Sequence, residues 1–420
     1  MAATALTVAG PARRAWLALL PLLALYVAVC AFTQPGPVPV NDERSLLEGA
    51  ERLLDGRYAV RGTGDDVDWL WHGPGLPLVL APLVARGLPL DVIRMLLGPV
   101  LLFGAVVALH AALRRHVPGR VALGGAVALG LFGPAMQPLR TVHKEPLAIL
   151  LVAVAMLLVS RAVADRRPAD VAGAGAALGA LVMVRVEYGW VLLALLAVAL
   201  GVWLARRSAR RTARMCAAVL AAGLACCVPW LAYTADVSGR FPYWGNSGGE
   251  SLYWMSPTGV PGQTGEFNGV RSVFERAELA PARPLFRRLD RLPPLQRDLE
   301  LRRVAAANVR AGPGRYARNL AANAVRLWFL VPTRPAPPAG AVAMYAAFNG
   351  ALLAALAWAA AVLVRRRRRL PAVALAFALF AAAGLGIHLL PSADPRMTLP
   401  LLPPLVWLVA LAAAHRRAHR

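Results

Sequence analysis

The sequence is poor in cysteine. Its 420 residues include only Cys30, Cys216, Cys226 and Cys227, with no Cys-x-x-Cys pair and no His/Cys spacing typical of a metal site. All four cysteines fall within or at the edges of apolar runs. A cysteine in that setting is usually a small packing residue, so we interpret all four in this way rather than as metal ligands.

Acidic residues are also scarce, with 22 Asp and Glu against 46 Lys and Arg and a net charge of +24. A chain this basic can indicate a nucleic-acid partner. Here the arginines collect in short clusters between apolar runs, which is the topology signal of membrane proteins rather than of a groove that follows phosphates. We therefore expect a lipid bilayer as a partner and no nucleic acid.

Apolar residues are abundant. They make up 58% of the chain, against about 45–50% in soluble domains. The long runs have about the 20-residue length that crosses the hydrocarbon of a bilayer. We predict an all-α, polytopic membrane bundle of about ten transmembrane helices. The expected spans are 15–33, 89–112, 121–137, 145–163, 170–184, 187–205, 213–235, 341–364, 371–390 and 397–414.

Two other stretches differ from the spans. Residues 73–87 are apolar but short and broken by proline, which predicts a helix lying at the interface. Segment 236–338 is long and polar; its composition predicts loop over 241–265 and two or three helices over 281–330. We therefore expect an N-terminal transmembrane module (1–235, with a first external loop at 34–88), an external loop domain (236–338) between spans seven and eight, and a C-terminal transmembrane module (339–420).

The arginine clusters predict the orientation of the bundle. With ten spans, the short arginine-rich loops all fall on the side of the N-terminus, which the positive-inside rule assigns to the cytoplasm. Both termini are then cytoplasmic, in a plasma (inner) membrane protein. Arg13 and Arg14 before the first apolar run predict an uncleaved first helix. The polar segment 236–338 falls on the external face, which is compatible with the rule because long loops cross regardless of charge.

The stretch Asn41-Asp42-Glu43-Arg44 opens an acidic segment directly after the first span. Two interpretations of its carboxylates stay open. They can cap and begin a helix that continues through 45–50. They can also stay ionised at a membrane surface and remove a proton from an acceptor hydroxyl. The two roles are compatible, because a helix N-terminus also orients a carboxylate. We take Asp42 and Glu43 as the candidate catalytic residues.

Six more ionisable residues lie at the same predicted edge of the bilayer: His72, Lys144, Glu145, Arg185, Glu187 and Arg396. Each has an ordinary explanation, such as a structural hydrogen bond, a contact with a helix dipole, mutual pairing or contact with lipid headgroups. The alternative is that they bind substrate together, with Arg396 holding a phosphate. Acids and arginines from five separate segments converge on one face, and this convergence predicts a site.

No cofactor follows with certainty from the sequence. Asp65, Asp66 and Asp68 form a second acidic cluster, and carboxylate oxygens are ligands that divalent cations accept. A solvated loop is the ordinary explanation of such a cluster. A divalent cation therefore stays open, and no residue is assigned to it.

The order of these pieces resembles the GT-C glycosyltransferases, specifically the family 39 type related to protein O-mannosyltransferases and bacterial lipid A aminoarabinose transferases. The matching pieces are Asn-Asp-Glu at 41–43 with 48–58, His-Gly-Pro-Gly at 72–75, Lys-Glu-Pro at 144–146, Arg-Val-Glu at 185–187, segment 239–253 and Pro-Arg-Met at 395–397. They follow in the family's order over most of the chain. Gly73 stands where the family's His-Pro-Pro segment has its first proline, and Met397 stands where the family has tyrosine.

This resemblance implies a GT-C-like bundle, a polyprenyl-phosphate-linked sugar donor, an external active site and inverting displacement at the anomeric carbon. It also implies that Asp42 is the base. The acceptor would be a glycan, lipid or protein of the cell envelope. A transporter or flippase of lipid-linked sugars or envelope polymer is the alternative. It predicts functional polar groups midway through the spans, whereas inverted halves typical of secondary transporters are not visible in the sequence.

Overall fold

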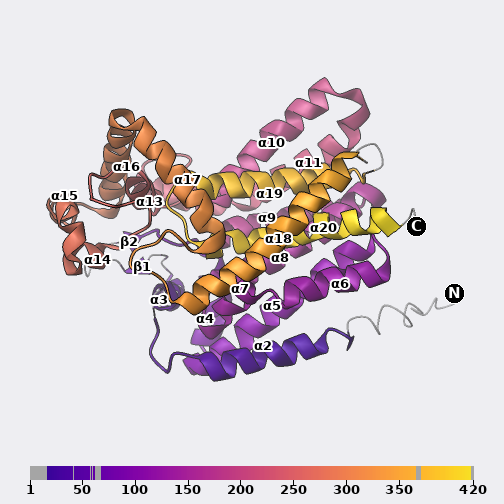
Figure 1. Ribbon diagram of the computed structural model, residues 1–420, viewed down its shortest axis with the longest axis horizontal. Coiled ribbons are helices and arrows are strands. Elements are labelled where there is room, and N and C mark those ends of the chain that lie inside the picture. The colour runs from indigo at the N-terminus through magenta and orange to yellow at the C-terminus, as the bar shows by residue number, and fades with distance from the viewer. Residues whose placement is uncertain are drawn as a thin grey trace.

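The protein is described by a computed structural model that covers residues 17–40, 42–56, 58, 60–61, 68–365 and 370–417. Apolar helices lie side by side along the long axis of the molecule, and shorter helices gather at one end (Figure 1). We call that end, which carries the helices within 42–84 and 248–329, the polar end. All site residues predicted from the sequence lie in or next to it.

The bundle is built from helices that match the apolar runs. They are α2 (Leu20–Thr33), α5 (Leu90–Arg114), α6 (Gly119–Gly130), α8 (Lys144–Asp165), α9 (Pro168–Val184), α10 (Tyr188–Ala205), α11 (Arg210–Cys226), α12 (Val228–Ser238), α18 (Ala339–Arg365), α19 (Val373–Leu389) and α20 (Leu402–Arg417). Their breaks have local causes. Pro168 occupies the first turn of α9, where its missing N–H costs nothing, and Gly239 ends α12 in a left-handed conformation.

Among the described residues, five helices are long and apolar enough to cross a membrane, and seven if two bent pairs each count as one span. The bent pairs are α6 with α7 (Gly133–Met136) and η1 (Gln137–Arg140), at 58°, and α11 with α12, at 47°. The remaining expected spans correspond to α2, α9 and α19, which are apolar helices of 14 or 17 residues. The protein is thus a multi-pass membrane bundle, and the number ten stays a prediction.

The first external loop of the prediction folds as a small cap over the bundle. It contains α3 (Asp42–Leu54), an antiparallel pair of short strands, β1 (Val60–Arg61) and β2 (Asp68–Trp69), and α4 (Gly75–Val84). The turn before α4 packs directly on the end of α9. A side-chain carbon on Gly73 would lie 2.0 Å from the backbone oxygen of Met183, so only glycine fits there. The expected short helix over 73–87 is therefore present.

Segment 236–338 holds a second hydrophobic core at the polar end. Its helices are α13 (Gly248–Met255), α14 (Val270–Glu275), α15 (Arg283–Leu289), α16 (Pro294–Ala311) and α17 (Pro313–Phe329), with the 3-10 turn η3 (Ala277–Ala282) between α14 and α15. Two or three helices are expected over 281–330, and three are present there: α15, α16 and α17. The expectation of loop throughout 241–265 is wrong, because α13 forms within it. Trp254 of α13 is fully buried and stacks on Phe286, and this tertiary contact outweighs the helix-breaking glycines.

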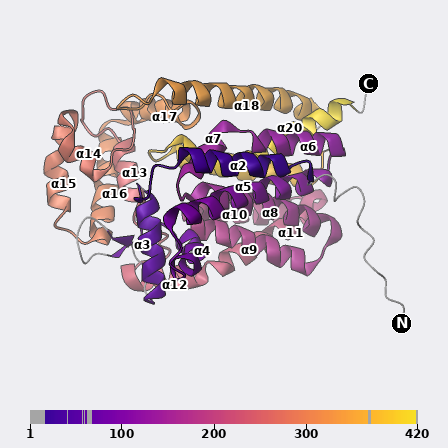
Figure 2. The ribbon, with the colours of Figure 1, turned by 90° about the horizontal axis from the view of Figure 1, so that it is seen from below.

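The described residues of the short arginine clusters lie at the other end of the bundle. Arg114 ends α5, and Asp165 ends α8, which begins at the polar end with Lys144. Arg115 and Asp165 form an ion pair of 3.0 Å there. α2 begins and α20 ends toward this same end (Figures 1 and 2). The charge asymmetry that predicts orientation is therefore a property of the folded bundle, while its orientation relative to the cell stays a prediction.

Candidate active site

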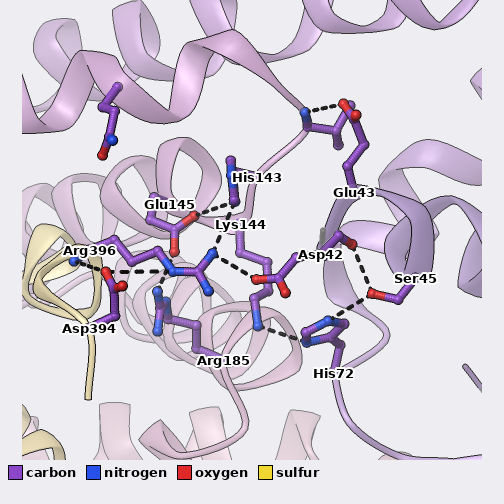
Figure 3. A network of polar contacts seen from close by, with 12 residues as sticks. Asp42, Glu43, Ser45, His72, His143, Lys144, Glu145, Arg185, Asp394 and Arg396 are labelled. Atoms are coloured by element: carbon purple, nitrogen blue, oxygen red, sulfur yellow. Dashed lines mark hydrogen bonds and ion pairs between the residues drawn. The ribbon is translucent and has the colours of Figure 1, made fainter. Parts of the chain in front are cut away.

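A network of polar side chains occupies the junction between the bundle and the polar end (Figure 3). It draws on the first turn of α3, the segment before α4, the start of α8, the connection between α9 and α10, and η5 (Pro395–Leu401), which precedes α20. These elements are up to about 350 residues apart in the sequence, since Asp42 and Arg396 come from its two ends. All eight site residues predicted from the sequence belong to this network or adjoin it.

Asp42 and Arg396 are in direct contact. A guanidinium nitrogen of Arg396 lies 2.7 Å from Oδ2 of Asp42, and the two side chains are 30% and 25% exposed. Burial raises the pKa of Asp42, but the positive charge of Arg396 outweighs it and holds that pKa below its usual range. Asp394 caps η5 by accepting from the backbone N–H of Arg396 at 3.0 Å, which orients the arginine. An ionised carboxylate with solvent access therefore sits against a partly exposed guanidinium.

Glu43 points the other way and is fully buried. Its carboxylate accepts from Arg94 of α5 at 2.8 and 2.5 Å, from the backbone N–H of Val142 at 2.7 Å and from that of Val40 at 3.2 Å. Burial opposes ionisation, but the Arg94 hydrogen bond and the two backbone donors lower the pKa of Glu43. All of this bonding fastens α3 to α5 and to the segment before α8. Glu43 therefore holds Asp42 in place rather than facing a substrate.

His72 joins two arms of the network. Its Nδ1 lies 3.0 Å from the ammonium nitrogen of Lys144, and its Nε2 lies 3.1 Å from Oγ of Ser45. Burial, and next the charge of Lys144, lower the pKa of His72 to about 3, so the ring is neutral. A neutral ring beside an ammonium accepts at Nδ1, which leaves the Nε2–H to donate to Ser45. The hydroxyl of Ser45 donates in turn to the backbone oxygen of Asp42 at 2.8 Å.

A second carboxylate–guanidinium cluster lies deeper. Arg185 bonds Glu145 at 2.6 Å and Glu187 at 2.9 Å, and Arg185 and Glu145 are almost completely buried. Burial raises the pKa of Glu187, but Arg185 outweighs it and lowers that pKa to about 2. Glu187 remains 30% exposed, so its second oxygen can meet a ligand. The three residues thus form a charged floor under Asp42 and Arg396.

Three residues that the sequence reasoning missed complete the site. His143 lies between Glu145, 3.5 Å away, and a guanidinium nitrogen of Arg396, 3.4 Å away. Tyr188 and His388 are buried with ring centroids 5.9 Å apart, and the Tyr188 hydroxyl and His388 Nε2 have no hydrogen-bond partner among the described residues. A buried polar atom without a partner is costly, so such atoms mark where a ligand or water binds. His388 ends an apolar span, where a lone histidine is a signal that could have been noticed.

An apolar cavity of about 640 Å³ lies between α8, α10, α11 and α19, and its lining runs from Phe380 to Ala209 and Leu370 at the arginine-rich end of the bundle. It is lined by side chains such as Met156, Leu195 and Phe377. Phe380 also lines the cavity and stacks on Tyr188 at 5.9 Å, which connects the cavity to the charged floor. The arrangement can therefore accept a molecule with an apolar tail below and an anionic or hydroxyl-bearing group above.

No group of three or more His, Cys, Asp and Glu side chains that could hold a metal ion comes together in the part of the chain that the structure describes. Two residues of the acidic cluster predicted from the sequence, Asp65 and Asp66, lie outside the described residues. The third, Asp68, belongs to β2. The positive charges next to Asp42 and Glu145 are those of Arg396 and Arg185.

No protein-family model matches the chain, and no curated protein matches its sequence. Its fold, however, matches solved structures. The chain is similar to the oligosaccharyltransferase AglB from Archaeoglobus fulgidus, solved in complex with an inhibitory peptide and a dolichol-phosphate, with a TM-score of 0.54 and 14% identity over 98% of this chain and 51% of AglB. The Archaeoglobus fulgidus oligosaccharyltransferase in complex with Zn and sulfate gives 0.53 and 14%, over 96% and 49%.

ArnT from Cupriavidus metallidurans bound to undecaprenyl phosphate is similar over 97% of this chain and 79% of its own, with a TM-score of 0.43 and 16% identity. The chain spans about half the length of the archaeal enzyme. The similarity to the archaeal oligosaccharyltransferase confirms the predicted fold class, a GT-C-like helical membrane bundle.

Proposed function

We propose that this protein is a membrane glycosyltransferase that moves a sugar from a polyprenyl-phosphate-linked donor to an acceptor hydroxyl. The observation that carries the proposal is the contact between Asp42 and Arg396 at 2.7 Å. A carboxylate that can take a proton and a guanidinium that can bind a phosphate face the same partly exposed space. These are the two groups that transfer from a phosphate leaving group requires.

Asp42 and Arg396 together account for the proton and the charge in the transfer step. The acceptor oxygen attacks the anomeric carbon of the donor and forms the new glycosidic bond. The bond from that carbon to the phosphate oxygen breaks, and the electron pair leaves with the polyprenyl phosphate. Asp42 takes the acceptor proton, and Arg396 stabilises the charge that develops on the departing phosphate. Attack opposite to the leaving group inverts the anomeric centre, as the resemblance to the family 39 type implies.

The ion pair couples donor binding to the strength of the base. With Arg396 against it, Asp42 has a low pKa and is a weak base. A donor phosphate that draws the guanidinium toward itself weakens this contact and raises the pKa of Asp42. Lys144 is held by neutral His72, and Arg185 by Glu145 and Glu187. These cations supply further charge for the phosphate without leaving their partners.

The cavity between α10 and α19 suits the donor's isoprenoid tail. A volume of about 640 Å³ accommodates several isoprene units, and the rest of a longer tail extends into the bilayer. Tyr188 and His388, with their unpartnered polar atoms, lie where a tail in the cavity would meet the phosphate or sugar. The remaining parts of the assignment follow the sequence: an extracytoplasmic site, a multi-pass protein of the inner membrane, and an envelope glycan, lipid or protein as acceptor.

The placement of the polar network favours transfer over flipping. A transporter or flippase predicts functional polar groups midway through the spans. Here Lys144 begins α8, Arg185 follows α9, Tyr188 begins α10 and Arg396 precedes α20, all at the ends of helices that meet at one surface of the bundle. This placement supports an enzyme that works at one face of the membrane.

Purified full-length protein, given labelled polyprenyl-phospho-sugars and an envelope extract, tests the proposal. We expect transfer of label to the extract and loss of transfer in Asp42→Asn. Asp55→Asn is the matched control, because Asp55 is an exposed residue near the other end of the same helix. Full transfer by Asp42→Asn would contradict the assigned base. Movement of labelled lipid across liposome membranes with no new glycosidic bond would contradict the enzyme and support the flippase.

A further inference from the structure

A second pocket lies at the polar end and is lined by none of the residues of the network around Asp42. It has a volume of about 440 Å³ and is formed by the first turn of α10, residues 240–245 and the middle of α16. Its wall combines two arginines, Arg240 and Arg302, with the aromatic side chains of Trp190, Phe241, Tyr243 and Trp244. No lining residue is acidic. The pocket is thus positively charged and aromatic.

The arginines of this pocket are held differently. Arg302 donates from Nε to Oδ2 of Asp298 at 2.8 Å. The buried Asp298 also accepts from the Tyr243 hydroxyl at 3.2 Å and from the backbone N–H of Gly249 at 2.6 Å, so the wall is fixed in position. Arg240 is exposed, and no residue that the structure describes forms an ion pair with it. One guanidinium is therefore preorganised and the other is available, which suits a phosphate group.

The aromatic residues fit a position at the boundary of the bilayer. Trp190, in the first turn of α10, is 48% exposed, and Phe241 is 74% exposed. Aromatic side chains with both an apolar body and a polar atom gather at the level of lipid headgroups. The indole N–H of Trp244 is buried and has no hydrogen-bond partner among the described residues.

An exposed apolar stripe continues from the pocket down α10. At 100° per residue, Trp190, Leu193, Ala197 and Leu204 lie on one side of the helix, and all four are exposed. Leu195, Ala199 and Val202, which line the cavity assigned to the donor tail, lie on the other side. Pocket and cavity therefore open on different faces of α10. A molecule in this pocket with chains along the stripe does not occupy the donor cavity.

We propose that this pocket binds the headgroup of an anionic glycerophospholipid, whose acyl chains lie along the exposed stripe of α10. The phosphate contacts Arg240 and Arg302, while Trp190 and Phe241 flank the glycerol region. Charge complementarity and continuity with the lipid-facing side of α10 select a lipid over a soluble anion. The site fixes the depth of α10 in the bilayer. The proposal concerns lipid binding and stands whether or not the protein transfers sugar.

Native mass spectrometry of the full chain in nanodiscs of equimolar phosphatidylglycerol and phosphatidylcholine tests this site. We expect retained phosphatidylglycerol in the wild type. The variant Arg240→Gln/Arg302→Gln loses two charged hydrogen-bond donors, which reduces the retained ratio of phosphatidylglycerol to phosphatidylcholine about tenfold or more. The matched control Arg287→Gln/Arg291→Gln removes the same charge from exposed residues of the same segment and leaves the ratio unchanged. Equal loss in both variants would overturn the proposal.

Two further measurements guard against a misfolded variant and against the wrong anion. Arg240→Gln alone changes only an exposed residue and lowers the ratio in a protein with wild-type unfolding temperature. In the unmodified chain, a photoactivatable phosphatidylglycerol labels residues 240–245. Labelling that is absent from this segment would overturn the site. Displacement of the lipid by an equal concentration of inorganic phosphate, or of a soluble envelope glycan, would overturn the assignment to a lipid.

Discussion

Two neighbouring carboxylates in the first turn of α3 differ in exposure and in hydrogen-bond partners. Asp42 meets one guanidinium, that of Arg396, and keeps a quarter of its side chain exposed. Glu43 meets Arg94 and two backbone N–H groups and is completely buried. Successive residues of a helix point about 100° apart, so one turn serves both the partly exposed site and the core. A carboxylate whose acceptor sites are all used by protein donors has a structural role, whereas one with free acceptor sites is available to a substrate.

The largest effect we expect from breaking this contrast is on stability. Glu43→Gln leaves Arg94 buried without its charge partner, and removing one member of a buried pair costs about 3–5 kcal/mol of unfolding free energy. Asp42→Asn, at a partly exposed pair, costs about 1 kcal/mol or less. Thermal and denaturant unfolding in detergent measure both. Equal destabilisation by the two variants would show that the pairs do not differ as described.

Arg396, the arginine of the partly exposed pair, tests the difference between the two carboxylates through the rate of sugar transfer. Arg396→Lys keeps a positive charge but loses the planar donor pair, and we expect a fall in transfer rate of about 10²–10³. The fold is retained, because the pair is partly exposed. Steady-state kinetics with the lipid donor measure the change. A matched Arg94→Lys should instead lower the unfolding temperature, and unchanged transfer by Arg396→Lys would contradict the phosphate role.

A third test uses pH. The pKa of His72, about 3, lies below the value of about 6.5 for an unfolded histidine. The unfolded chain therefore binds the proton more tightly, so the stabilisation by neutral His72 is complete above pH 6.5 and is lost as the pH falls toward 3. The expected slope from this residue is about 1.4 kcal/mol per pH unit within that window. Unfolding free energies of the wild type and His72→Asn at pH 7 and 5 measure it. Equal slopes in the two proteins would show that His72 does not stay neutral in the fold.

The smallest effect concerns divalent cations. Arg396 pairs with one oxygen of Asp42, and Arg185 pairs with one oxygen of Glu145, so fixed side chains supply positive charge next to the site. We therefore expect chelation by EDTA to change the transfer rate by less than about twofold, which is below the effect of one lost charge contact. The rate before and after chelation, and after Mn²⁺ or Mg²⁺ is restored, provides the measurement. A loss that only the metal restores would contradict it.

Much of this arrangement could be predicted from the sequence because apolar runs and charge patterns are local signals. Runs of about span length locate helices, and proline and glycine mark their ends, as at Pro168 and Gly239. The order of the polar motifs sufficed to place Asp42 and Arg396 in one site. The number of spans did not follow with the same clarity, because α2, α9 and α19 are shorter than the roughly 20 residues that cross a bilayer.

The separate roles of the residues in the site could not be predicted, because they depend on contacts between segments that are distant in the sequence. No residue near Glu43 in the sequence predicts its pairing with Arg94, which lies 51 residues later on α5. Tyr188 and His388 are brought together only by the packing of α10 against α19. Helix α13 was missed for the same reason. Its glycines suggest loop, and only burial of Trp254 against Phe286 stabilises the helix.

The most direct test is the rate of sugar transfer per folded molecule in Asp42→Asn and Glu43→Gln, with folded protein counted by monodisperse elution. A general base is worth about 10²–10⁴ in rate. We predict a loss of that size in Asp42→Asn with its fold intact. In Glu43→Gln we predict a lower yield of folded protein but a rate within about threefold of the wild type, because that carboxylate only positions α3. Undiminished transfer by folded Asp42→Asn would contradict the account.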